Sequence, residues 1–211
     1  EEKREKKKVL AVFSFFFFPE KALERKVEVL GEDHPDTMVS INNLGVLLQS
    51  QGKHEEAERS FRSAMEKCRR VLGPEHPNSL ITTVNTGAVL VALGRFQEAL
   101  DLLAASEQAV RQGFSGISAA WHAKCQLNLG LAHAALGHFA ATERTLREAH
   151  GTFLEVRGAE HRDTRICLTA LIELYTAWNI QDPTGGHDTP LAEWRAELAA
   201  LPDLVPPGES R

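Results

Sequence analysis

The sequence contains the eight-residue stretch LGEDHPDT at residues 30–37, and this stretch returns as LGPEHPNS at residues 72–79, 42 residues later. A degenerate copy, RGAEHRDT at residues 157–164, follows after two more steps, one of 43 and one of 42. Further columns with these steps are Gly45, Gly87 and Gly130; Gly52, Gly94, Gly137 and Asn179; Leu48, Leu90, His133 and Tyr175; and Asn43, Asn85 and Asn128. Independent columns with shared steps indicate an array of structural repeats.

The residue types in these columns predict pairs of helices joined by short connectors. Gly31 follows an amphipathic stretch, where a helix ends readily through a left-handed residue. Pro35 suits the first turn of the next helix, which needs no backbone donor there. Gly45 lies in mid-helix, where glycine costs about 1 kcal/mol relative to alanine. It therefore predicts a close approach to a second helix, with Ala57 on the facing side.

Apolar residues recur at three- and four-residue spacing through most of the chain, as amphipathic helices require. The expected helices are 20–30, 36–51, 54–72, 78–93, 96–112, 119–136, 139–156, 163–178 and 191–198. Residues 180–190 are expected to form an inserted turn, and Trp178 and Trp194 to seal the core at the end of the array. The last residues, 202–211, are expected to be disordered.

The segment 1–19 has an atypical composition for such an array. It joins a charged run to the apolar run Val9–Phe18. Ten apolar residues are too few to span a bilayer, which needs about 20. We interpret the segment as an irregular cap, disordered, or the junction of a fragment.

The stretch GKHEEA at residues 52–57, with Asn43-Leu44-Gly45 before it and Phe61 and Ala64 after it, resembles the tetratricopeptide repeat (TPR). The 42-residue period and the Leu-Gly-x-x-His-Pro connector resemble the long variant found in kinesin light chains. The resemblance implies an all-α fold, a right-handed α-solenoid of stacked antiparallel helix pairs. Its expected bounds are 20–201, with a partial repeat at 20–31 and repeats at about 35–73, 77–113, 119–157 and 163–201. The third repeat departs from the pattern, since Thr142 stands where alanine is usual and its connector lacks His-Pro.

In such an array the first helix of each pair lines the concave face, which is the usual recognition surface. The resemblance places these predicted partner-binding residues there: Asn42, Asn43, Val46, Gln49, Ile81, Val84, Asn85, Ala88, Lys124, Leu127, Asn128, Leu131 and Glu173. The kinesin light chain resemblance implies that the asparagine column binds the backbone of an extended peptide, because an amide both donates and accepts. The alternative is that these asparagines cap or bridge neighbouring helices.

No residue pattern in the sequence supports a catalytic or a metal-binding site. His161-Arg162-Asp163 matches the start of a kinase catalytic loop, but Leu168 stands where that motif needs asparagine. The triplet instead occupies the connector of the repeat, where His34 and His76 also precede helix starts and are expected to cap or pack. His133 and His138 are five apart, the wrong spacing for one helical face. We expect no catalytic residue, metal site or cofactor.

The net charge and the cysteine content exclude further classes of protein. The net charge is −5, without the clustered basic face of a nucleic-acid binder. Cys68, Cys125 and Cys167 are scattered and form no CxxC pair, which argues against disulfides and zinc knuckles and favours a reducing compartment. A cytoplasmic location follows from this expectation.

The sequence therefore predicts a non-catalytic scaffold or adaptor that binds a partner peptide or protein in the concave groove. The alternative is a regulatory or substrate-recruiting tail of a larger signalling enzyme. Residues 171–178 and 191–198 resemble the last repeat of tails on bacterial serine/threonine protein kinases, and the chain does not begin with methionine. Self-association of the array is a third option. The identity of the partner is not encoded in a readable motif.

Overall fold

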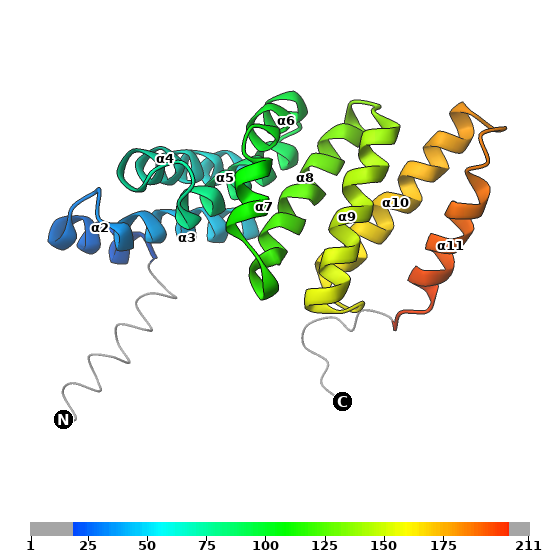
Figure 1. Cartoon of the computed structure of the whole chain (residues 1–211). Coiled ribbons are helices and arrows are strands. Elements are labelled where there is room, and N and C mark those ends of the chain that lie inside the picture. The colour runs from blue at the N-terminus through cyan, green and yellow to red at the C-terminus, as the bar shows by residue number, and fades with distance from the viewer. Residues whose placement is uncertain (1–18, 203–211) are drawn as a thin grey trace. The chain divides into compact units, whose positions relative to one another are not determined.

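The computed structural model describes residues 19–202, and over this range the regular elements are all helical (Figure 1). The chain divides into two compact units, Glu1–Gly94 and Arg95–Arg211. The described helices of the first unit are α2 (Pro19–Leu30), α3 (Pro35–Ser50), α4 (His54–Leu72) and α5 (Pro77–Ala92). Those of the second are α6 (Phe96–Ala104), α7 (Glu107–Gly113), the 3-10 helix η1 (Gly116–Ala119), α8 (Ala120–Ala135), α9 (Phe139–Arg157), α10 (Arg162–Gln181) and α11 (Asp188–Ala199).

In the first unit each helix packs against the next one in the chain, and α3 also contacts α5. The turn between α3 and α4 passes through Gly52, whose φ of 77° is in the left-handed region that favours glycine. A core of Leu48, Ala57, Phe61 and Val89 joins α3, α4 and α5. The close approach predicted at Gly45 is present, but its nearest neighbour is the ring of Phe61 rather than Ala57.

Histidine caps the three helices that follow the repeated connector. His34 Nδ1 accepts a hydrogen bond from the backbone N–H of Asp36 at 3.2 Å. His76 and His161 make the equivalent bond to the second residue beyond them, each at 3.1 Å. Because the first N–H groups of a helix lack partners within the helix, these bonds satisfy donors that would otherwise be unpaired. The predicted capping role is confirmed at all three histidines.

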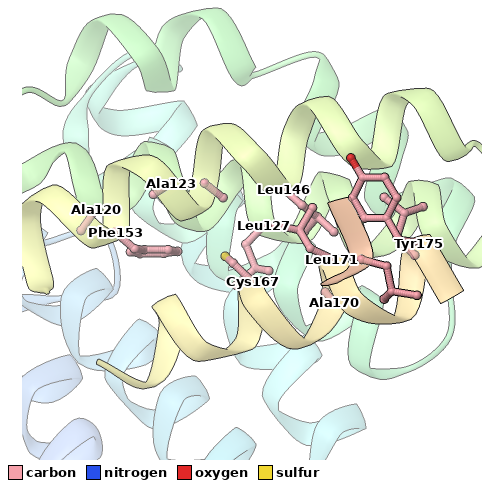
Figure 2. Packing of buried hydrophobic residues seen from close by; sticks show 12 residues of the cluster. Ala120, Ala123, Leu127, Leu146, Phe153, Cys167, Ala170, Leu171 and Tyr175 are labelled. Carbon is pink, nitrogen blue, oxygen red and sulfur yellow. The ribbon is translucent and has the colours of Figure 1, made fainter. Parts of the chain in front are cut away.

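The second unit is built on a core shared by α8, α9, α10 and α11. Figure 2 shows Leu127 of α8, Leu146 and Phe153 of α9, and Leu171 and Tyr175 of α10 packed together in this core. Leu191 of α11 is buried in the same cluster, and Trp178 and Trp194 pack against it. The two tryptophans therefore cover the core between the last helices, as the sequence predicted.

The single helix expected at 96–112 is broken in the structure. Helix α6 ends at Ala104 and α7 begins at Glu107, and the next helix is preceded by η1. The break falls in the only step of 43 residues, and it lets α7 pack on α8 with Val110 fully buried. Helix α10 also extends to Gln181, so the inserted turn is shorter than predicted.

None of the helices within residues 19–202 combines the length and the apolar composition that a membrane span needs. The apolar run Val9–Phe18 lies outside the described residues.

Candidate functional site

The structure divides the thirteen predicted partner-binding residues into three classes of exposure. The exposed residues are Asn43, Val46 and Glu173. The half-buried residues are Gln49, Ile81, Ala88, Lys124 and Leu131. The buried residues are Asn42, Val84, Asn85, Leu127 and Asn128. A partner that binds the folded protein can reach only the first two classes.

One exposed surface on α3 combines apolar and amide groups, and we call it the α3 face. It consists of Val39, Asn43 and Val46, which are spaced by four and three residues and therefore lie on one side of the helix. Val39 is 39% exposed and Val46 is 47% exposed. Asp36, in the first turn and three residues before Val39, is the only charged residue of α3.

The asparagine column does not present a uniform row of free amides. Asn85 of α5 donates from Nδ2 to Oδ1 of Asn42 on α3 at 3.0 Å, and both residues are buried. Asn128 donates from Nδ2 to the backbone carbonyl of Lys124, in its own helix, at 2.6 Å. Asn85 thus bridges neighbouring helices, which was the alternative role expected for this column. Asn43 is the exposed member.

Lys124 in the second unit interacts with an aromatic ring and with three charged side chains. Its Nζ lies 5.2 Å from the centre of the Trp121 ring, a distance within the range of cation–π attraction. Burial lowers the pKa of Lys124, Asp163 acts in the opposite direction, and Arg157 and Arg162 lower it further. Arg157 ends α9 and Arg162 begins α10, and the sequence pattern gave no indication that either lies near Lys124.

A polar cluster joins α7 to α8 and α9 within the second unit. The side-chain amide of Gln126 donates to Glu107 and to Glu148, both at 2.9 Å, although Gln126 is only 1% exposed. Arg111 pairs with Glu148 at 2.9 Å, and burial lowers the pKa of His122 beside it, with Glu148 opposing that shift. This cluster anchors α7 where the helix is broken, and no motif in the sequence pointed to it.

Within residues 19–202, no group of three or more His, Cys, Asp or Glu side chains is arranged to hold a metal ion. The three cysteines are free and buried. Burial raises the pKa of Cys125 and of Cys167 to about 12, so these thiols are not nucleophiles near neutral pH.

The family comparison agrees with the helix-pair geometry. A family model described as Tetratricopeptide repeat matches residues 20–67 and 39–112, and a second model with that description matches residues 123–148. Together the matches cover more than half of the chain. The chain belongs to the tetratricopeptide repeat family.

Solved structures of other proteins show a similar fold. One is the crystal structure of the putative kinesin light chain nearly identical TPR-like repeats from Podosopora anserina, with a TM-score of 0.63 and 22% identity. The match covers 86% of this chain and 84% of that one. Another is BtubC (BKLC) from P. vanneervenii, with a TM-score of 0.63, 16% identity and coverage of 92% and 76%. A comparison with curated protein sequences gives no significant match.

Proposed function

We propose that this tetratricopeptide chain is a non-catalytic scaffold or adaptor that holds a protein or peptide partner on the exposed faces of its first helices. The observation that carries the proposal is the α3 face, where Val39, Asn43 and Val46 are exposed side by side. Repeat proteins of this kind bind partners through surfaces that successive repeats build together. The half-buried Ile81 and Ala88 of α5 and the half-buried Leu131 of α8 are further candidates within their own units.

The composition of these helices indicates the kind of segment that fits. Helix α5 has no charged residue, and α3 has only Asp36. When a partner covers the exposed valines, the burial stabilises the complex by about 25 cal/mol for each Å² of apolar area removed from water. The amide of Asn43 can donate to and accept from a peptide backbone. We therefore propose an apolar partner segment whose backbone is bound by the side chain of Asn43, rather than by the whole asparagine column.

The test begins with affinity capture on the full chain and identification of bound proteins by mass spectrometry. Val46→Glu should then weaken binding of the captured partner by about tenfold or more, because it places a charge in an apolar contact. Val71→Glu is a matched control, since Val71 lies on α4 and is 44% exposed, against 47% for Val46. Equal affinity of both variants and the unchanged chain would exclude the α3 face as the binding surface.

We further propose that the protein works in the cytoplasm. Three free cysteines support a reducing compartment, because secreted proteins usually pair their thiols. The alternative role as the tail of a larger signalling enzyme stays a prediction. The coding sequence upstream of Glu1 checks it directly, since a protein kinase domain in the same reading frame would establish that role.

A further inference from the structure

Two histidines meet at the turn between α8 and α9. His133 lies in the last turn of α8, and His138 immediately precedes α9. Their Nδ1 atoms are 3.1 Å apart, with ring centroids separated by 5.4 Å. Their five-residue spacing is the wrong one for a single helical face. The two residues do not share a helix, because Gly137, with φ of 75°, turns the chain between them.

The backbone holds both residues in this arrangement. The N–H of His138 donates to the carbonyl of His133 at 2.9 Å, and the N–H of Leu136 donates to the same carbonyl at 3.2 Å. The N–H of Gly137 bonds to Ala134 at 3.0 Å. These bonds close the turn, so the two residues are held close together before any ligand arrives. A preorganised pair loses less conformational entropy when it binds.

The same turn in other repeats carries different residues. At the position of His133 the first and second repeats have Leu48 and Leu90, which are 6% and 0% exposed. At the position of His138 they have Lys53 and Arg95. Packing is thus satisfied by leucine followed by a long basic side chain. The histidine pair is a departure that the repeat fold itself does not require.

The two Nδ1 atoms lie at hydrogen-bond distance from each other, and the same separation suits a metal ion that displaces the shared proton. With metal–nitrogen bonds of about 2.0–2.1 Å, nitrogens 3.1 Å apart subtend roughly 100° at the metal. That angle lies between those of square-planar and tetrahedral coordination. Imidazole is a preferred ligand of Zn²⁺, Ni²⁺ and Cu²⁺, whereas Mg²⁺ and Ca²⁺ prefer oxygen. We propose that His133 and His138 form a two-histidine site for a divalent ion of the late first transition row, such as Zn²⁺, with water completing the coordination.

Metal binding requires neutral imidazoles, and the positively charged Arg144 interacts with His133. Arg144 is exposed on α9, and its charge weakens attraction for a cation. Two protein ligands and a nearby arginine give an affinity below that of a structural zinc site, which has four protein ligands.

The experiment is a titration of the full chain with Zn²⁺, followed by calorimetry and by ¹⁵N NMR of the histidine side chains. One equivalent should bind, with the coordination-induced shift on Nδ1 of His133 and His138, and Mg²⁺ should give no shift. The variant His133→Leu/His138→Lys restores the residues of the other repeats and should fold normally while its affinity for Zn²⁺ falls by about tenfold or more. The exposed single variant His138→Lys should show the same loss.

A control variant separates this site from the other histidines of the chain. His34→Asn/His161→Asn keeps a residue type that caps helices well, and it should bind Zn²⁺ as the unchanged chain does. The proposal is overturned if the unchanged chain fails to bind Zn²⁺ at millimolar concentration. Equal affinity in the chain with His138→Lys would overturn it as well.

Discussion

Individual glycines fix how closely the paired helices approach. A Cβ atom added at Gly45 would lie 2.7 Å from the Phe61 ring, and one at Gly130 would lie 2.6 Å from Leu146. Both neighbours are completely buried. We predict that alanine at either glycine lowers the free energy of unfolding by about 1–3 kcal/mol, because overpacking outweighs the gain in helix propensity. Gly151 of α9 is exposed with nothing within 4 Å of an added Cβ, so Gly151→Ala should stabilise. Unfolding in urea measures the free energy of unfolding of all three alanine variants. A higher value for Gly45→Ala than for the unchanged chain would contradict the packing argument.

At the scale of secondary-structure elements, the histidine caps decide where helices begin. His76 Nδ1 accepts from the backbone of Asn78 at 3.1 Å, and Pro77 between them favours the first helical turn. Replacing His76 with alanine should lower the free energy of unfolding by about 0.5–2 kcal/mol, because a backbone donor loses its acceptor. His76→Asn should retain most of the stability, since asparagine is an effective cap. Thermal unfolding followed by circular dichroism compares the two, and equal stability of both variants would show that the cap contributes little.

The elements also show how far a sequence predicts this structure. The positions of α3, α4, α5, α9 and α10 follow from periodicity and from the repeated connectors, because helix starts and ends depend on local residues. The break between α6 and α7 was not predicted, since it depends on tertiary contacts such as those of Glu107 and Gln126. The exposure of the predicted site was also only partly predictable. Asn85 lies on the expected helix, but it packs toward α3, and periodicity within one helix does not distinguish that side from the solvent side.

At the scale of the whole molecule, buried histidines make stability depend on pH through the second unit. Burial lowers the pKa of His122 and of His150, with Glu148 and Glu197 respectively opposing these shifts. As the pH falls below about 6.5, the ordinary pKa of histidine, the unfolded chain takes up protons before the folded chain does. The folded state therefore loses stability from that pH down to the lowered pKa values of its buried histidines. The loss is at most about 1.4 kcal/mol per pH unit for each histidine. Denaturant unfolding should give a lower free energy of unfolding at pH 5.5 than at pH 7.5. His150→Gln should reduce this difference between the two pH values, because glutamine takes up no proton. An unchanged difference in that variant would show that His150 is not one of the groups responsible.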